Sequence, residues 1–112
     1  VGRNAEGANA AGGLKFSIGK PRPSLFPVIV FWHIVLVLTF GAAKYTRNGV
    51  PGDNNWQKNS PADYVDALER HLAEWKMGRT ADPESGYHPL AHAAVSLIFV
   101  LWFELTGNWS KQ

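Results

Sequence analysis

The sequence predicts an all-α fold, a compact bundle of three main helices. Two apolar runs of helical length, residues 25–43 and 89–105, flank an amphipathic run at residues 61–77. No segment of the 112 residues alternates convincingly between polar and apolar side chains, so no strand is expected. A chain of this length forms a single domain. We assign that domain to residues 14–112, behind a flexible arm of Gly, Ala and Asn residues at 1–13.

The first helix is expected to begin after Ser24 as its N-cap, with Pro27 tolerated in the first turn. Over residues 25–40 the only polar side chains, apart from one indole N–H, are His33 and Thr39. Such a run is either a transmembrane candidate or a central helix buried on all sides, partly by another subunit. Pro27, His33 and the absence of Lys or Arg at its start favour burial in protein. We therefore expect a homo-oligomer that completes the bundle, and no membrane insertion.

Local signals define the other two helices. Residues 46–59 are dense in Asn-Gly, Pro-Gly and Asp-Asn turn signals. Ser60 then caps the second helix, which carries Pro61 at its first position and closes at Gly78. The third helix begins at Pro89 and ends at Gly107. The core stripe of the second helix, at helical spacing, consists of Val65, Leu68, Leu72 and Trp75.

Composition excludes several functional classes. The net charge of +2 comes without the clustered basic stripe that nucleic-acid binding needs, so no nucleic-acid partner is expected. The chain has no cysteine, which excludes disulfides and thiolate metal sites and fits a reducing cytoplasm. No basic segment followed by an apolar run opens the sequence, so no secretory signal peptide is expected.

Residues 63–92 concentrate the ionisable side chains, with three of the four histidines and six of the nine acids. His71 lies beside the core stripe of the second helix, a position suited to a partly enclosed site. Asp82 and Glu84 place two carboxylates in the loop before the third helix. His88 and His92 are four residues apart, a spacing that can bind one transition metal. The purely structural alternatives are an Asp66–Arg70 helix pair, helix capping by Asp82 or Ser85, and a His92 that caps or bonds a carboxylate.

Several short motifs recur in a distinctive order along the chain. They are LKF at 14–16, GKPRP at 19–23, LTFGAAKY at 38–45, NW at 55–56, DALERH at 66–71, Trp75, DPESG at 82–86 and HPLAHA at 88–93. None is specific alone, but their order and spacing over about residues 14–105 resemble a phage-associated family of small all-α proteins, the dATP/dGTP diphosphohydrolases. That family is related to the MazG-like nucleotide pyrophosphohydrolases.

The resemblance implies an enzyme that hydrolyses dATP or dGTP to the monophosphate and pyrophosphate. It would control the dNTP pool in the cytoplasm of an infected host cell. The resemblance also implies a Mg²⁺ or Mn²⁺ cofactor held by Asp82 and Glu84. The implied catalytic residues are His71, Asp82, Glu84 and His92. The implied substrate-binding residues are Lys20 and Lys44 for phosphate, Asn55 and Trp56 for sugar or base, and Arg70 and His88.

One departure from the family pattern leaves other functions open. MazG-like relatives carry acids along the first helix, whereas residues 30–36 here contain no carboxylate. The first alternative is therefore a non-catalytic nucleotide-binding protein, a sponge that keeps the pocket without cutting its ligand. The second is an oligomeric, membrane-associated structural protein built on the two apolar helices.

Overall fold

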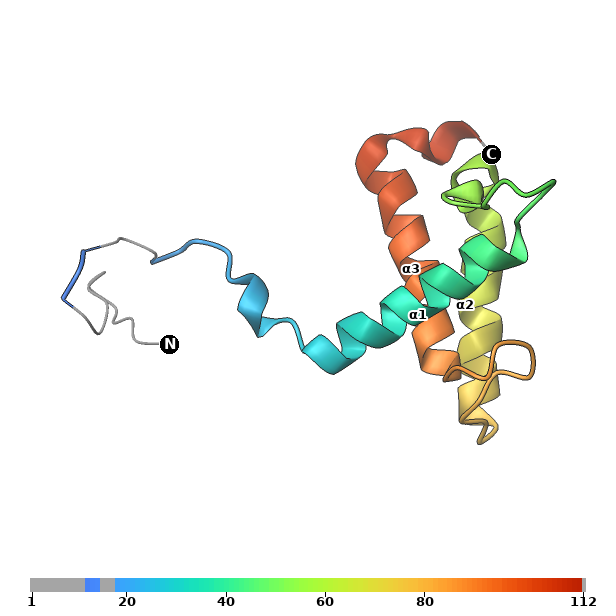
Figure 1. Ribbon diagram of the computed structural model, residues 1–112, viewed down its shortest axis with the longest axis horizontal. Coiled ribbons are helices and arrows are strands. Elements are labelled where there is room, and N and C mark those ends of the chain that lie inside the picture. The colour runs from blue at the N-terminus through green and yellow to red at the C-terminus, as the bar shows by residue number, and fades with distance from the viewer. Residues whose placement is uncertain (1–11, 15–17, 112) are drawn as a thin grey trace.

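The computed structural model describes residues 12–14 and 18–111, and three α-helices dominate them. The helices are α1 at Val28–Lys44, α2 at Pro61–Lys76 and α3 at Pro89–Thr106, with short 3-10 helices η1 at Pro23–Leu25, η2 at Asn55–Lys58 and η3 at Asn108–Lys111. Figure 1 shows α2 and α3 side by side and α1 crossing them. No strand occurs among the described residues, where the bridge between Arg47 and Val50 stands isolated. The predicted all-α fold is confirmed.

The predicted N-terminal arm at residues 1–13 lies outside the described residues, apart from Gly12 and Gly13.

The start of α1 differs from the prediction by three residues. The helix begins at Val28, with Pro27 as its N-cap in an extended conformation, while Ser24 belongs to η1. The ring of Pro27 disfavours helical geometry at the residue before it, and Phe26 is accordingly extended, with ψ at 124°. Proline at this point therefore begins the helix instead of lying inside its first turn.

Local caps fix the ends of α2 and α3 as predicted. Ser60 Oγ accepts a hydrogen bond from Ala62 N at 3.2 Å, and Pro61 follows at the first helical position. At the C-terminal end of α3, Gly107 takes the left-handed conformation, with φ at 72°. The N-cap of α3 is His88, whose Nδ1 accepts from Leu90 N at 3.0 Å. Neither Asp82 nor Ser85 caps α3, which corrects that structural alternative.

The core forms where α1 crosses α3. Ile34 and Val37 of α1 pack against Val95 of α3, and Tyr87, Ala91, Ala94 and Phe99 surround them. The packing of α2 is only partly as predicted: Val65, Leu68 and Leu72 are half-buried, but Trp75 is 45% exposed. The face of α2 that turns inward is shifted toward Tyr64, Ala67, His71 and Glu74, all half-buried. This shift brings polar side chains to the centre of the bundle.

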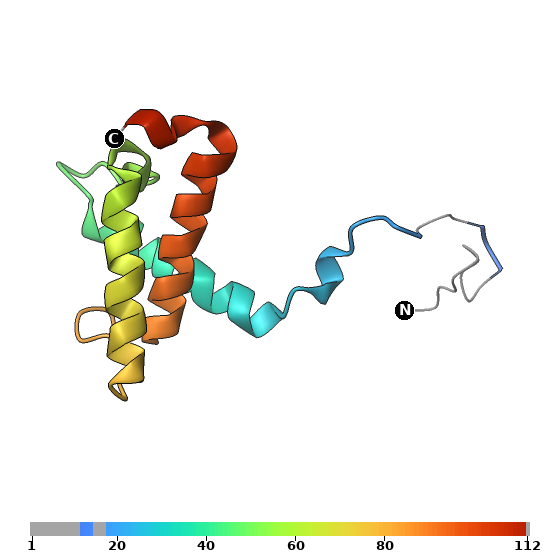
Figure 2. The ribbon, with the colours of Figure 1, turned by 180° about the vertical axis from the view of Figure 1, so that it is seen from behind.

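Two helices leave apolar surface uncovered. Within the described residues α1 buries Ile34 and Val37, so it is not the fully enclosed helix that the sequence suggested. Its N-terminal half extends beyond α3 on the side away from α2 in both views of the ribbon (Figures 1 and 2). By length and composition alone α3 qualifies as a membrane span, with 18 residues and a mean hydropathy of 1.6. The core helix of a soluble protein has the same properties.

Candidate functional site

A cavity of about 760 Å³ lies between the C-terminal half of α1, the turn region before α2, α2 itself and the start of α3. This volume falls in the range of small-molecule sites, roughly 300–1,000 Å³. Its walls combine apolar and polar side chains from all three helices and the loops. The ionisable residues that line it are Lys44, Asp53, Asp63, Arg70, His71, Asp82, Glu84 and His92, together with Tyr45 and Tyr64.

A group of three side chains able to hold a metal ion adjoins the cavity, and two of its members, His71 and Asp82, line it. One ligand atom each from His71, Glu74 and Asp82 lies within 4.8 Å of the others, and all three residues are half-buried. His71 and Glu74 come from one face of α2, three residues apart, whereas Asp82 comes from the loop before α3. His71 Nδ1 lies 2.8 Å from Glu74 Oε1, and Arg79 Nη1 donates to Glu74 Oε2 at 3.3 Å. One imidazole and two carboxylates suit a divalent cation.

The loop before α3 is folded around the carboxylate of Asp82. Asp82 Oδ2 accepts hydrogen bonds from Glu84 N at 3.0 Å, Ser85 N at 2.9 Å and Ser85 Oγ at 3.3 Å. Burial raises the pKa of Asp82, but the bonds from Ser85 and Glu84 outweigh burial, and the net pKa is lowered. Asp82 is therefore a fixed carboxylate, ionised at neutral pH.

His92 connects this loop to α3. Its Nε2 lies 2.6 Å from Ser85 Oγ and 3.9 Å from Asp82 Oδ2, and its ring stacks on His71 with 4.8 Å between centroids. Burial lowers the pKa of His92, the charge on Asp82 opposes this, and the neighbouring His71 lowers it further. The imidazole is consequently neutral near pH 7. Because Ser85 Oγ donates its proton to Asp82, His92 Nε2 donates to Ser85 Oγ, and Nδ1 is the nitrogen that can accept a proton.

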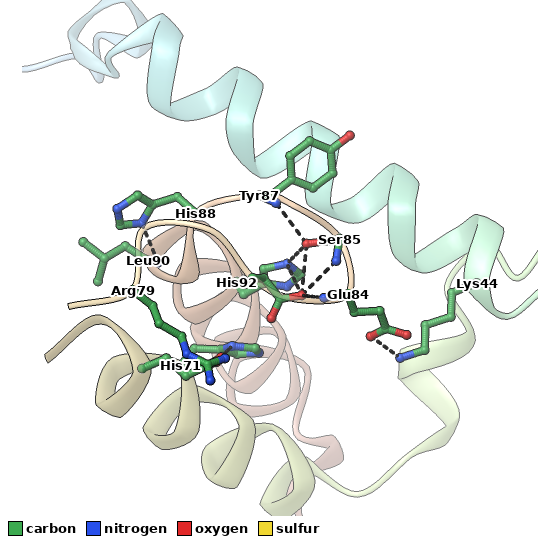
Figure 3. Close-up of polar contacts among 11 residues, drawn as sticks. Lys44, His71, Arg79, Glu84, Ser85, Tyr87, His88, Leu90 and His92 are labelled. Atoms are coloured by element: carbon green, nitrogen blue, oxygen red, sulfur yellow. Dashed lines mark hydrogen bonds and ion pairs between the residues drawn. The ribbon is translucent and has the colours of Figure 1, made fainter. Parts of the chain in front are cut away.

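Glu84 forms an ion pair with a lysine of the cavity, and its predicted role as a metal ligand stays a prediction. Its Oε1 pairs with Lys44 Nζ at 2.9 Å, at the C-terminal end of α1 (Figure 3). The hydrogen bond that Lys44 donates to Glu84 raises the pKa of Lys44. Among the described residues the metal-capable group includes Glu74 where the sequence pointed to Glu84. Glu84 instead holds the lysine at the cavity.

Three members of an aromatic cluster, Trp56, Tyr64 and Phe99, also line the cavity. The ring of Trp56 stacks on Phe99 at 4.1 Å with 9° between planes, and the rings of Trp102 and Phe103 meet it edge-on. The hydroxyl of Tyr64 donates to Trp56 O at 3.3 Å and accepts from Asn59 Nδ2 at 2.8 Å. Trp56 is thus fixed in place while it lines the cavity.

The structure gathers most of the predicted site residues at this cavity. Its lining includes Lys44, Asn55, Trp56, Arg70, His71, Asp82, Glu84 and His92. It does not bring Lys20 or His88 there. Lys20 lies ahead of η1, and His88 is the α3 cap.

Sequence reasoning did not single out Glu74 or Ser85 as site residues. The spacing of Glu74, three residues after His71 on one helix face, was the available signal.

Fold and site together define a small all-α domain with a cavity lined by ionisable side chains and a candidate divalent-cation site beside it. Residues 10–112 match the family described as "dATP/dGTP diphosphohydrolase, N-terminal", and the chain belongs to this family. The family resemblance expected from the sequence is confirmed.

A curated relative supports the same family. The chain is 36% identical over 90 residues to a Salmonella phage PMBT28 protein named "dATP/dGTP diphosphohydrolase". The alignment covers 80% of this chain and 29% of the phage protein, so the chain spans less than a third of its relative's length. No solved structure matches the chain.

Proposed function

We propose that this domain binds dATP or dGTP in its cavity and hydrolyses it to the deoxynucleoside monophosphate and pyrophosphate. The observation that carries the proposal is the metal-capable group of His71, Glu74 and Asp82 at the edge of a nucleotide-sized cavity. The name of the phage relative supplies the substrate class. By the same inference the domain acts on the dNTP pool in the cytoplasm of a phage-infected cell.

The donor set fits a divalent cation. A bound cation would neutralise phosphate charge and polarise the phosphoryl oxygens. Of the two ions expected, the imidazole of His71 favours Mn²⁺, because Mg²⁺ takes oxygen ligands almost exclusively.

The other residues of the cavity have distinct parts in this proposal. Lys44 and Arg70 bind the phosphates, and Trp56 and Asn55 hold the base and sugar. Water attacks the α-phosphorus, the bond from that phosphorus to the bridging oxygen breaks, and pyrophosphate leaves. His92 takes the proton from the water, since burial lowers its pKa and keeps it neutral.

The test is a turnover assay with each of the four dNTPs and either Mg²⁺ or Mn²⁺, measuring pyrophosphate and monophosphate. We expect turnover of dATP and dGTP, with His71→Ala reducing it at least about 100-fold. Glu69→Gln is the matched control, because Glu69 is exposed on α2 outside the cavity and its loss should leave the rate unchanged. Absence of turnover with any purine dNTP by folded protein rejects the proposal.

Loss of catalysis with retention of binding is the competing outcome. The segment of α1 that lines the cavity, within residues 37–44, contains no carboxylate, which favours the nucleotide-sponge alternative. Equilibrium dialysis of dATP and dGTP with and without EDTA separates the two functions. Tight binding that survives EDTA, with the nucleotide recovered intact, supports the sponge.

A further inference from the structure

Ser96 is a buried residue of α3 whose hydroxyl takes no part in the hydrogen bonds of the fold. The residue is 6% exposed, and it lines the cavity. Its hydroxyl has no hydrogen-bond partner among the residues that the structure describes, and protein atoms do not seal off its oxygen. The hydroxyl of Ser96 is therefore open to the cavity.

This state is unusual for a hydroxyl inside a helix. Serine and threonine side chains there generally point to solvent or donate to the backbone carbonyl four residues earlier. Thr39 and Thr106 follow the second pattern, and each donates to that carbonyl at 2.8 Å. Ser96 does neither. Because burying a hydroxyl without a partner destabilises a fold, a hydroxyl kept in this state at a cavity indicates a ligand that bonds to it.

Ring contacts between α2 and α3 fix the level of Ser96 in the bundle. The rings of His71 and His92 stack with 4.8 Å between centroids, and those of Tyr64 and Phe99 meet edge-on at 5.1 Å. The two contacts pair the helices in antiparallel order, as Figure 1 shows. Ser96 lies between them, about 6 Å along the helix axis from His92 and about 4.5 Å from Phe99.

Small side chains leave room for a ligand at this level. Of the residues that α2 and α3 contribute to the lining of the cavity, Ala67 and Ser96 have the smallest side chains. Both lie between the two ring contacts, Ala67 on α2 and Ser96 on α3. A ligand that extends from the aromatic side chains to the histidines can therefore approach the two helices closely beside Ser96.

We propose that Ser96 binds the 3′-hydroxyl of the deoxyribose, an inference that rests on the proposed function. The deoxyribose joins the base to the phosphates. With the base at the aromatic side chains and the phosphates near the candidate metal site, the sugar lies at the level of Ser96. The 3′-hydroxyl is the one free hydroxyl of that sugar, and a serine hydroxyl can both donate to it and accept from it. Phosphate oxygens are the poorer partner, because Lys44 and Arg70 offer them charged donors at the same cavity.

The dissociation constants of two nucleotides that cannot be cut test this role of Ser96. They are the α,β-methylene forms of dATP and of 2′,3′-dideoxy-ATP, measured by titration calorimetry with Mn²⁺. The unmodified chain should bind the dATP form about 3- to 12-fold more tightly, the contribution of one neutral hydrogen bond. Ser96→Ala should remove this preference by weakening the dATP form alone. Thr106→Val is the matched control, because it removes a hydroxyl from α3 outside the cavity, and it should keep the preference.

Urea denaturation gives a second readout that needs no nucleotide. Ser96→Ala should keep or raise the urea midpoint, since no internal hydrogen bond is lost, whereas Thr106→Val should lower it. A lower urea midpoint in Ser96→Ala would show that its hydroxyl supports the fold, which would overturn the proposal.

Three binding results would also overturn the role of Ser96. They are no preference in the unmodified chain, an undiminished preference in Ser96→Ala, and equal weakening of both nucleotides in that variant. If the unmodified chain binds and cuts dATP in any of these cases, the role of Ser96 fails and the proposed function stands. If the folded chain binds neither nucleotide, both fail.

Discussion

The metal-capable group in the structure contains Glu74, whereas the sequence pointed to Glu84, and this difference leads to the sharpest prediction. Glu74→Gln and Glu84→Gln are isosteric changes of one charge each, ten residues apart in the chain. The structure places Glu74 within 4.8 Å of the ligand atoms of His71 and Asp82, whereas Glu84 pairs with Lys44. Glu74→Gln should therefore weaken Mn²⁺ binding strongly, and Glu84→Gln should not.

The expected magnitudes follow from burial and partners. The side chain of Glu74 is 19% exposed, and it already makes charge-assisted bonds to His71 and Arg79. A charge-assisted contact contributes about 1.5–3 kcal/mol, which corresponds to about a 10- to 150-fold loss of Mn²⁺ affinity. Glu84 is 58% exposed and Lys44 40%, so their pair contributes about 0–1 kcal/mol and its loss changes Mn²⁺ affinity by at most about fivefold.

Electron paramagnetic resonance of free aqueous Mn²⁺ measures both affinities directly, with circular dichroism to verify the fold of each variant. Cis ligands around one small divalent ion lie about 3 Å apart, so the three ligand atoms need to approach by only about 1–2 Å on binding. A strong loss of Mn²⁺ affinity in Glu84→Gln, with Glu74→Gln unchanged, would refute the reasoning. It would restore the pair Asp82 and Glu84 predicted from sequence.

Three further predictions concern stability, each measured by urea denaturation. Ser85→Ala removes the hydroxyl between Asp82 and His92 and should cost about 1–3 kcal/mol; a change below about 0.5 kcal/mol would contradict the role of that hydroxyl. Because burial lowers the pKa of His92, the unfolded chain binds more protons than the folded chain below about pH 6.5. The free energy of unfolding should therefore fall as the pH drops through that range, and it should fall less in His92→Gln. Equal dependence of the unfolding free energy on pH in the two proteins would argue against this role of His92. Gly52→Ala should lower the free energy of unfolding by about 1–3 kcal/mol, because a Cβ there meets Tyr45 atoms at 2.7 Å. Gly41→Ala should raise it by about 0.5–1 kcal/mol, because Gly41 lies in a helix with open space around its Cβ position. Equal effects of the two substitutions would refute the steric argument.

The helix ends that sequence predicted correctly depend on local chemistry. Ser60 with Pro61 begins α2, and Gly107 ends α3, because each satisfies backbone groups within a few residues of itself. The predicted start of α1 was wrong, and the reason is equally local. Pro27 acts on the residue before it, so the helix begins at Val28.

The candidate site was predictable as a region but not as a set of ligands. The clustering of acids and histidines in the sequence pointed to this region, and His71, Asp82 and His92 do converge there. To predict that Glu74, and not Glu84, lies beside His71 and Asp82, one must know how α2 is rotated against α3 and how the loop at residues 82–86 folds. Both are set by long-range packing that a single sequence does not encode locally.

The carboxylate-free α1 does not exclude the proposed metal site. MazG-like relatives are expected to draw ligands from the first helix, whereas the candidate ligands here are His71 and Glu74 of α2 and Asp82 of the loop before α3. The part left to α1 is an apolar wall that ends in one cation, Lys44, held by Glu84. An apolar wall strengthens the interaction of a polyphosphate with the charges opposite it, because it excludes water. The lack of acids on α1 is thus compatible with hydrolysis, and the metal affinity of Glu74→Gln tests the ligand group that replaces them.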